Sequence, residues 1–598
     1  ATEAASEGVR WTFAPMVDIA RDPRWGRIAE GAGEDPYLGS TMARAMVEGF
    51  QGSDLADPNT IVACPKHYVA YGGAEGGRDY NTVDVSERVL REIYLPPFKA
   101  AIVDAGAGTI MSAFNDLNGV PASANRYTLT GILREEWGFD GFVVSDWNAI
   151  GELLNHGIAG TPAEAAREAV NAGVDMDMQG DVYRRNLARL VKEGQVSEKV
   201  IDEAVKRILR IKFKLGLFER PYVDPERART AIQSRENIET ALEAARRSIV
   251  LLKNEGDLLP LKKDIGSVAV IGPLADDRSA PLGPWSCRGN PEDVVTVLDG
   301  IKSRVSPKTE VLYAKGCKVE GALTEGIDEA VEVARKSDVA IVVVGESAEM
   351  SGEAACRASL DLPGVQEELV RAIHETGIPV VEVLMNGRPL SISWSAEHIP
   401  AILEAWFPGI QGGNAIADVI FGDYNPGGKL PVTFPRTVGQ VPIYYNHKST
   451  GRPPSPDKWT SKYLDIPFTP LFPFGHGLSY TRFEYSNLQI SRKKIGPDGQ
   501  VEISVDVRNI GDRKGDEVVQ LYLRDVVASV TRPVKELKGF KRITLEPGEK
   551  RTVKFTVTWE QLSFINRDMK RVVEPGTFEV MVGRSSEDIQ LTGSFEVE

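Results

Sequence analysis

Polar side chains follow short apolar runs at several places in the first third of the sequence. In GFVVSDW, the apolar residues 142–144 are followed by Ser145, Asp146 and Trp147. A carboxylate at the end of a buried strand can act as a nucleophile or a general base, and an adjacent indole offers a flat apolar face to a ligand. The structural alternative for Asp146 is to cap a following helix.

A second polar pair stands in CPKHYVAYGG, where Lys66 and His67 are consecutive. Both side chains can donate hydrogen bonds to a ligand. A surface lysine beside a histidine that is bonded within the protein is the more common explanation of such a pair, since lysine is rarely buried. The pair alone therefore indicates a binding site only weakly.

Charged residues are dense in the Gly-rich segment DPRWGRIAEGAGEDPYLGS (22–40), which contains Arg24, Arg27, Glu30, Glu34 and Asp35. Pairs of arginine and carboxylate would hold such a loop rigid. A guanidinium left over from these pairs could donate to a polar ligand. Both roles remain open for these residues.

Three carboxylates lie in VVVGESAEMSGEAACRASLDLP, which follows another apolar run: Glu346, Glu349 and Glu353. A loop of small residues is a reasonable carrier of a mobile acid. The chain has no GxxxxGK[ST], HExxH, GxSxG or helix-opening GxGxxG pattern. A hydrolase that works with two carboxylates and without a metal or cofactor is consistent with these residues.

Composition limits the other functions. The 598 residues carry a net charge of −15, which argues against nucleic acid as a partner. No apolar run approaches the ~18 residues that a membrane helix needs. The four cysteines form no CxxC pair, and the 6 histidines leave little room for a histidine-rich metal site. A Cys287–Cys317 disulfide cannot be decided from spacing.

The residues 1–220 alternate apolar runs with helical patterns, which predicts a parallel α/β sheet. We expect strands at 11–19, 60–69, 108–115, 141–147 and 173–178. Reactive groups at the carboxyl ends of such strands are typical of a (β/α)8 barrel or an open α/β sheet. Five strands cannot close an eight-stranded barrel, so either the sheet is open or the first units precede this sequence.

The pattern of apolar and polar residues changes twice after residue 220. A linker at 221–245 precedes a second α/β domain at 246–435, with strands expected in SVAVIGPLA, DVAIVVVGE, IPVVEVLMNG and AILEAWF. A connector rich in Pro, Gly and aromatic residues spans 436–480. From 481 to 598, alternating segments such as VEISVDVRNIG and EVVQLYLRD predict a β-sandwich of the fibronectin III or immunoglobulin type.

Several of these segments together resemble glycoside hydrolase family 3, particularly its bacterial β-glucosidases. The segments that carry the likeness are FAPMVDIARDPRWGRIAEGAGEDPYL, PKHYVAYGGAEGGRDYN, IMSAFNDLNGVPA, GFVVSDW, LMNGRPL and NPGGKLPVTFP. The resemblance covers nearly the whole chain and implies a (β/α)8 barrel, an (α/β)6-sandwich and a fibronectin III-like domain. It also implies that the barrel's first units and the Asp that grips the sugar lie upstream of Ala1.

The resemblance assigns roles to individual residues. It implies that Asp146 is the nucleophile and that Glu353 of SGEAACR is the acid/base, with Glu349 and Glu346 as second choices. It implies that Arg27, Lys66 and His67 donate to sugar hydroxyls. Trp147, Met111 and Phe114 are further candidate substrate contacts. Many members have a Tyr where this chain has Phe114, so a hydroxyl near the nucleophile is missing.

The expected function is that of a retaining, exo-acting β-glucosidase that needs no cofactor or metal. The carboxyl groups of a retaining enzyme stand about 5–5.5 Å apart. A β-xylosidase or dual-specificity enzyme is the close alternative, and an inactive sugar-binding protein is the alternative of another class. N-acetylglucosaminidase activity is disfavoured, because GGAEGGRDYN replaces the His-containing loop of those members. We expect a small carbohydrate substrate, no nucleic acid or membrane partner, and a periplasmic or secreted location; a homodimer remains open.

Overall fold

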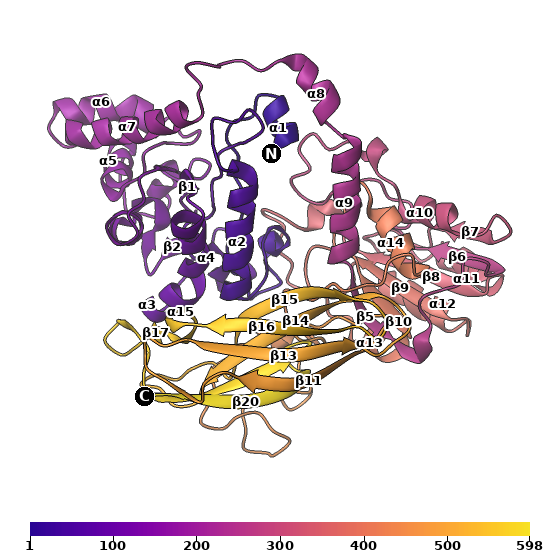
Figure 1. Ribbon diagram of the computed structural model, residues 1–598. Coiled ribbons are helices and arrows are strands. Elements are labelled where there is room, and N and C mark those ends of the chain that lie inside the picture. Colours follow the sequence, from indigo (N-terminus) through magenta and orange to yellow (C-terminus); the bar gives the residue numbers. More distant parts are fainter. The chain divides into compact units, whose positions relative to one another are not determined.

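A computed structural model describes all residues 1–598, which divide into two compact units (Figure 1). The first unit comprises Ala1–Ala20 and Glu30–Asn237, and the second comprises Arg21–Ala29 and Ile238–Glu598. The short segment Arg21–Ala29 thus belongs to the second unit, although the first unit flanks it on both sides in the sequence.

Extended segments of the first unit pair in parallel and in chain order. Strand β1 (Thr109–Met111) pairs with β4 (Phe142–Val144), and single bridges join the remaining neighbours: Trp11 with Val62, Met16 with Lys66, Tyr68 with Ser112, and Val144 with Met176. The strands expected at 11–19, 60–69 and 173–178 are therefore extended chain with isolated bridges. Pairing of consecutive segments is the order found in a parallel α/β barrel, and the closed barrel stays a prediction.

Helices surround these segments and bury their apolar faces on them. The main ones are α2 (Pro36–Gln51), α3 (Glu87–Val89), α4 (Leu95–Lys99), α5 (Pro162–Ala172), α6 (Val182–Lys192) and α7 (Glu198–Lys214), with α1 (Thr2–Ser6) and α8 (Pro225–Ala231) as short additions. Helix α5 begins at a capping box formed by Thr161 and Glu164. The core includes Val69, Ile110 and Val143 from the extended segments and Phe98 and Leu129 from the helices.

The second unit begins with a six-stranded sheet in the order β5–β10–β9–β8–β6–β7. All neighbours are parallel except β5 and β10. The bounds are β5 (Val250–Asn254), β6 (Ser267–Ile271), β7 (Glu310–Ala314), β8 (Val339–Gly345), β9 (Val380–Met385) and β10 (Ala401–Glu404). The four strands expected from the sequence are present as β6, β8, β9 and β10.

Helices cover both faces of this sheet, as its continuous apolar strands require. Residues of α10 (Val297–Arg304) and α14 (Gly412–Ile420) share one apolar cluster with the sheet, and residues of α11 (Ile327–Arg335) and α12 (Gln366–His374) share the other. Two further helices complete this part of the chain, α9 (Arg235–Ser248) and α13 (Ser393–His398).

The C-terminal part of the second unit is a two-sheet β-sandwich with a core of alternating apolar residues. One sheet has the order β11–β13–β16, and the other has the order β12–β20–β19–β14–β15. The bounds are β11 (Phe483–Ile490), β12 (Lys494–Ile495), β13 (Val501–Asn509), β14 (Gly515–Asp525), β15 (Glu536–Leu545), β16 (Lys550–Val557), β19 (Gly576–Gly583) and β20 (Ile589–Val597). The sandwich predicted from residue 481 onward is confirmed.

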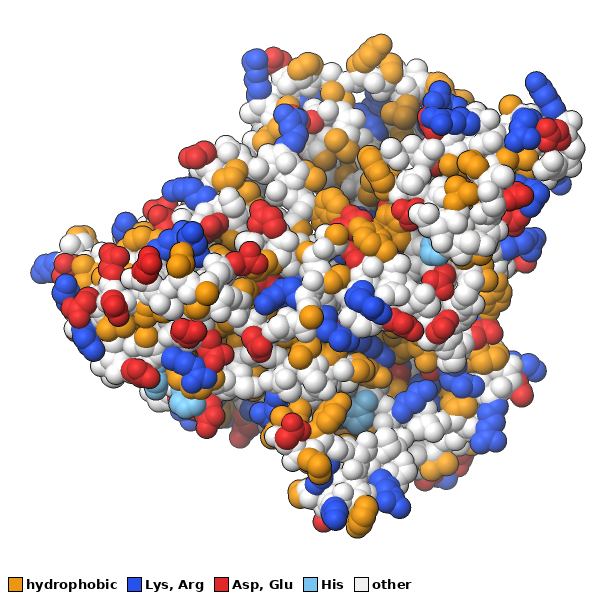
Figure 2. Space-filling view, turned by 180° about the vertical axis from the view of Figure 1, so that it is seen from behind, with side chains coloured by type: hydrophobic (Ala, Val, Ile, Leu, Met, Phe, Trp, Pro, Cys, Tyr) orange, Lys and Arg blue, Asp and Glu red, His pale blue; other side chains and the backbone are white.

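Three global features bear on function. Acidic and basic side chains alternate over the face drawn in Figure 2, without a broad stripe of one sign. None of the helices is both long and apolar enough to span a membrane. All four cysteines are free, with Cys64 and Cys317 buried and Cys287 and Cys356 exposed, so the Cys287–Cys317 disulfide is not formed.

Candidate active site

Asp146 stands directly after β4, as the sequence predicts. The strand is buried along its length, and Asp146 itself is only 8% exposed. Its Oδ1 accepts a hydrogen bond of 2.7 Å from the backbone N–H of Trp147. The preceding Ser145 hydroxyl accepts a hydrogen bond from the backbone N–H of Met178, which ties the strand end to the neighbouring extended segment. The carboxylate is therefore held on a rigid support.

His67 lies between two carboxylates of the first unit. Its Nδ1 is 2.9 Å from Asp18 Oδ2, which also accepts a hydrogen bond of 3.0 Å from the His67 backbone N–H. Its Nε2 is 3.6 Å from Asp146 Oδ2. Because an ionised carboxylate only accepts hydrogen bonds, Nδ1 carries a proton and the ring presents Nε2 to Asp146. Asp18 and His67 are both buried, so the ring orientation is fixed.

The other residues predicted in the first unit differ in their surroundings. Lys66 is half-buried beside His67, and Trp147 is 60% exposed beside Asp146. The Phe114 ring packs against the ring of Tyr71, which in turn contacts the His67 ring at 5.1 Å between centroids. Met111 lies buried in an apolar cluster that also contains β4 residues. The substrate contacts of these side chains stay predictions.

The three carboxylates of the second unit are not equivalent. Glu346, at the end of β8, is completely buried, and its Oε1 is 2.7 Å from Arg357 Nη1 and 2.9 Å from Arg388 Nε. Its Oε2 accepts a hydrogen bond of 3.0 Å from the Ser351 hydroxyl. A carboxylate that is enclosed and bonded in this way is poorly suited to exchange a proton with a ligand.

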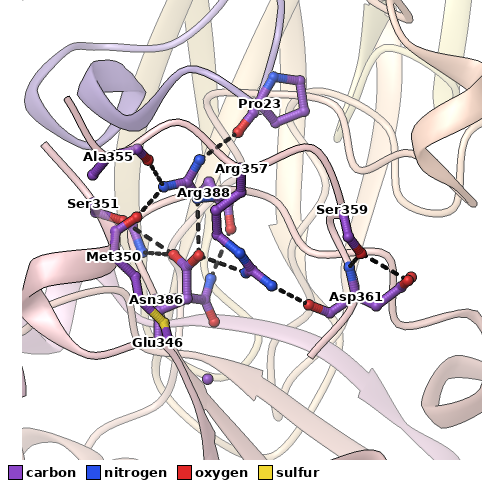
Figure 3. A network of polar contacts seen from close by, with 12 residues as sticks. Pro23, Glu346, Met350, Ser351, Ala355, Arg357, Ser359, Asp361, Asn386 and Arg388 are labelled. Atoms are coloured by element: carbon purple, nitrogen blue, oxygen red, sulfur yellow. Dashed lines mark hydrogen bonds and ion pairs between the residues drawn. The ribbon is translucent and has the colours of Figure 1, made fainter. Parts of the chain in front are cut away.

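Arg388 contacts the same loop (Figure 3). It follows β9 and is completely buried. Its guanidinium donates to the backbone carbonyls of Pro23, Arg24, Met350 and Ala355. Burial lowers the pKa of the guanidinium, and the adjacent Glu346 carboxylate opposes that shift. The arginine thus joins the loop that follows β8 to the segment Arg21–Ala29 of the same unit.

Glu353 lies on the part of this loop that remains accessible. Its side chain is 26% exposed, and its Oε1 is 3.8 Å from Nη1 of the buried Arg27. The Arg27 guanidinium is also 5.9 Å from the centroid of the Trp285 ring. Glu353 and Trp285 line a pocket of about 430 Å³, together with Glu349 at its exposed rim. Accessibility therefore favours Glu353 or Glu349 over Glu346 as an acid/base.

The structure brings the predicted residues together in two groups, one in each unit. The first contains Asp146, His67 and Lys66, and the second contains Glu353 and Arg27. Sequence reasoning missed two residues. Nothing in the expected strand at 11–19 indicates that Asp18 contacts His67, and nothing in the run NGRPL indicates that Arg388 reaches four carbonyls distant in the sequence.

A rigid carboxylate beside a carboxylate-bound histidine, and a second carboxylate over a pocket, are the groups of a hydrolase that cleaves glycosidic bonds. Comparison with known families agrees. The N-terminal domain of glycosyl hydrolase family 3 matches residues 1–211, its C-terminal domain matches 249–480, and a fibronectin type III-like domain matches 517–586.

Individual relatives extend over the whole chain. A periplasmic beta-glucosidase of Salmonella typhimurium is 47% identical over 100% of this chain and 81% of its own length. A beta-xylosidase of Formosa agariphila is 47% identical over 98% of this chain and 83% of its own. A crystal structure of beta-glucosidase from Listeria innocua in complex with isofagomine superimposes with a TM-score of 0.96, at 42% identity, over 100% of this chain and 83% of that one. The chain belongs to glycoside hydrolase family 3.

Proposed function

We propose that this glycoside hydrolase is a retaining, exo-acting β-glucosidase that removes glucose from the non-reducing end of β-glucosides or cello-oligosaccharides. The observation that carries the proposal is the chain of contacts from Asp18 through His67 to Asp146 at the end of β4. It places a histidine ring nitrogen 3.6 Å from a buried carboxylate. A proton on that nitrogen would favour the ionised state that a nucleophile needs. The relatives from Salmonella typhimurium and Listeria innocua are named beta-glucosidases.

The reaction follows from the chemistry of two carboxyl groups. In the first step, Asp146 attacks the anomeric carbon and the C–O bond to the aglycone breaks, while protonated Glu353 gives its proton to the departing oxygen. This leaves a glucosyl ester on Asp146. In the second step, Glu353 accepts a proton from water, the water oxygen bonds to the anomeric carbon, and Asp146 leaves as a carboxylate. The anomeric configuration is retained.

Neighbouring donors would hold the sugar during both steps. Lys66 and His67 are assigned to sugar hydroxyls, and Arg27 is assigned to the same task near Glu353. Trp147 offers an exposed indole face beside the nucleophile, against which a sugar ring can pack. Met111 and Phe114 complete the proposed set.

The nucleophile can be tested directly. We expect Asp146→Asn to lower kcat by at least about 10³-fold while the variant still binds glucose, because the amide keeps the shape of the site but cannot form the ester. Incubation of the unchanged protein with a 2-fluoro-glucoside, followed by peptide mapping, should place the label on Asp146. Unchanged turnover in the variant, or a label elsewhere, would overturn this assignment. No label at all would favour an inactive sugar-binding protein.

A β-xylosidase or an enzyme of dual specificity is the second candidate, because the Formosa agariphila relative is named a beta-xylosidase at the same 47% identity. The two sugars differ by one hydroxymethyl group, and a pocket discriminates a group of that size by about 1–3 kcal/mol. Comparing kcat/KM for 4-nitrophenyl glucoside and 4-nitrophenyl xyloside decides between them. A ratio above tenfold in favour of the xyloside would replace the proposal.

We place the enzyme in the periplasm or outside the cell, following the relative from Salmonella typhimurium that is named periplasmic. Fractionation of the native host with an antibody tests this location. The homodimer stays a prediction, to be measured by light scattering.

A further inference from the structure

Arg388 is a buried arginine whose two terminal nitrogens both donate hydrogen bonds within the protein. Nη1 donates to the carbonyls of Pro23 at 3.2 Å and Arg24 at 2.9 Å, and Nη2 donates to those of Ala355 at 2.8 Å and Met350. Nε lies 2.9 Å from Oε1 of Glu346. Of the five N–H donors of the guanidinium, the four on Nη1 and Nη2 are thus hydrogen-bonded to carbonyls, and Nε takes part in the ion pair with Glu346.

These contacts anchor the loop on both sides of Glu353. Met350 precedes Glu353 and Ala355 follows it, and both carbonyls meet the same Nη2 atom. Glu346 adds two further ties, because it accepts from the Ser351 hydroxyl at 3.0 Å and from Arg357 Nη1 at 2.7 Å. Figure 3 shows these side chains converging on one centre. The loop is therefore anchored within a few residues of Glu353 on both sides, which restricts the movement of this residue.

The segment that carries Arg27 is fixed by the same centre. Besides the two carbonyls bound to Arg388, the Gly26 carbonyl accepts a hydrogen bond of 2.8 Å from the Gly352 N–H, and the Arg24 carbonyl accepts one of 3.0 Å from the Arg357 N–H. A Cβ on Gly26 would lie 2.3 Å from the Gly352 oxygen, so only glycine permits this approach. Arg27 and Glu353 therefore stand on two segments joined through Arg388.

Stability alone does not account for the buried ion pair of Arg388 and Glu346. Withdrawing two charges from water costs several kcal/mol, and apolar residues of the same volume often serve stability equally well. The planar guanidinium group of arginine has five donors in a fixed arrangement, so it can orient several backbone carbonyls at once. Apolar residues cannot do this. We propose that Arg388 and Glu346 form a positioning clamp that holds Glu353 and Arg27 in their working geometry without touching the substrate. The inference rests on the proposed role of Glu353 as acid/base.

The clamp can be weakened without removing its charge. Arg388→Lys keeps the positive charge but has three donors on one nitrogen, so it cannot serve carbonyls on both sides of the fork. Glu346→Gln keeps the shape of the carboxylate but removes the ion pair. Ser351→Ala is the mildest variant and removes one hydrogen bond to Glu346, which keeps the test available if either buried substitution prevents folding.

Leaving-group dependence distinguishes misplacement of an acid from a general loss of structure. Phenol needs protonation to depart from glucose, whereas 2,4-dinitrophenol does not. We expect Arg388→Lys to lower kcat/KM about 100-fold on phenyl glucoside, within the range attributed to general acid catalysis, and less than about threefold on 2,4-dinitrophenyl glucoside. Sodium azide should raise kcat on the dinitrophenyl substrate and yield glucosyl azide, because azide attacks the glucosyl ester without a general base. Glu346→Gln should behave in the same way, and Ser351→Ala should show about a threefold to tenfold effect on phenyl glucoside.

Two comparisons make the result decisive. Arg304→Lys in α10 is the matched control, because Arg304 also pairs with a buried carboxylate, that of Asp418, in the same unit. It should lower the unfolding temperature without changing the leaving-group dependence. Glu353→Ala should show the full leaving-group effect and azide rescue. If it does and Arg388→Lys instead loses activity equally on both substrates, the clamp is overturned while the proposed function stands. If Glu353→Ala shows neither signature, the acid/base assignment and the clamp both fall.

Discussion

The surroundings of single carboxylates separate their roles in this enzyme. Asp146 has a backbone donor on one oxygen and the His67 ring 3.6 Å from the other. Glu346 is enclosed and faces two guanidinium groups, whereas Glu353 is partly exposed beside one. What lies within about 4 Å of each carboxylate thus suits identical chemical groups to the different roles proposed for them, those of a nucleophile, a structural anchor and a proton carrier.

Asp18 should affect catalysis through His67, since its Oδ2 meets both the ring Nδ1 and the backbone N–H of that residue. Asp18→Asn removes the negative charge at Nδ1 and leaves a buried donor poorly satisfied, a loss of about 1–3 kcal/mol. We expect the first-order rate constant for trapping by a 2-fluoro-glucoside to fall about tenfold to a hundredfold. Quench-flow or residual-activity measurements check this. Asp54→Asn, at an exposed loop position, is the control; an equal effect of both variants would contradict the orienting role of Asp18.

At the level of secondary structure, periodicity predicts the strands that are long and buried and misses those that are short or at an edge. The seven apolar residues of β8 are recognisable as a core strand. The edge strand β7, EVLYA, has only one buried residue and no clear pattern, and β5 is followed by polar residues. In the first unit the apolar runs are real, but most of them pair through single bridges, because their backbones leave the parallel register after a few residues.

One buried strand residue makes stability depend on pH. Glu382 in the middle of β9 is completely buried, and neither oxygen has a hydrogen-bond partner of good geometry. Burial raises its pKa to about 7, an effect that the nearby Ser395 hydroxyl opposes and the charge of Glu367 reinforces. The unfolded chain releases this proton near pH 4.3. Stability is therefore lost as pH rises from about 4.3 to about 7, with a total of about 4 kcal/mol.

Glu382→Gln removes this titration. Relative to the unchanged protein, the variant should gain about 3–5 °C in unfolding temperature on going from pH 5 to pH 8, as measured by calorimetry. The comparison between two pH values cancels the cost of burying an amide, which does not depend on pH. Glu375→Gln, at the exposed end of α12, should show no such change. A difference between Glu382→Gln and the unchanged protein that is the same at both pH values would contradict the assignment.

For the molecule as a whole, local motifs predict the candidate site better than they predict what supports it. Asp146, His67 and Glu353 are visible because each follows an apolar run or stands in a family motif. The support given by Arg388 is invisible in the sequence, because its acceptors come from positions 23–24, 350 and 355 and meet only in the folded chain. The assignment of Arg21–Ala29 to the second unit is equally hidden, since its neighbours in sequence belong to the first.

The separation of Arg21–Ala29 in sequence from the rest of the second unit predicts how residues 238–598 behave when they are produced alone. The fragment 238–598 contains the residues of all three of its large apolar clusters, so we expect it to fold. It lacks the Pro23 and Arg24 carbonyls, and two donors of the buried Arg388 then lose their acceptors. A synthetic peptide of residues 21–29 should therefore bind the fragment and raise its unfolding temperature in a saturable manner.

The same peptide with Gly26→Ala is the matched control. Its methyl group would meet the Gly352 and Ala355 carbonyl oxygens at 2.3 and 2.5 Å, which are backbone atoms that cannot move aside cheaply. We expect it to raise the unfolding temperature by less than a quarter of the shift seen with the unchanged peptide at equal concentration. Arg388→Lys in the fragment should weaken binding of the unchanged peptide about tenfold or more, since each lost hydrogen bond from a charged donor is worth about 1.5–3 kcal/mol. Equal shifts from both peptides would mean that the segment attaches by its side chains and not through the carbonyls that Arg388 holds.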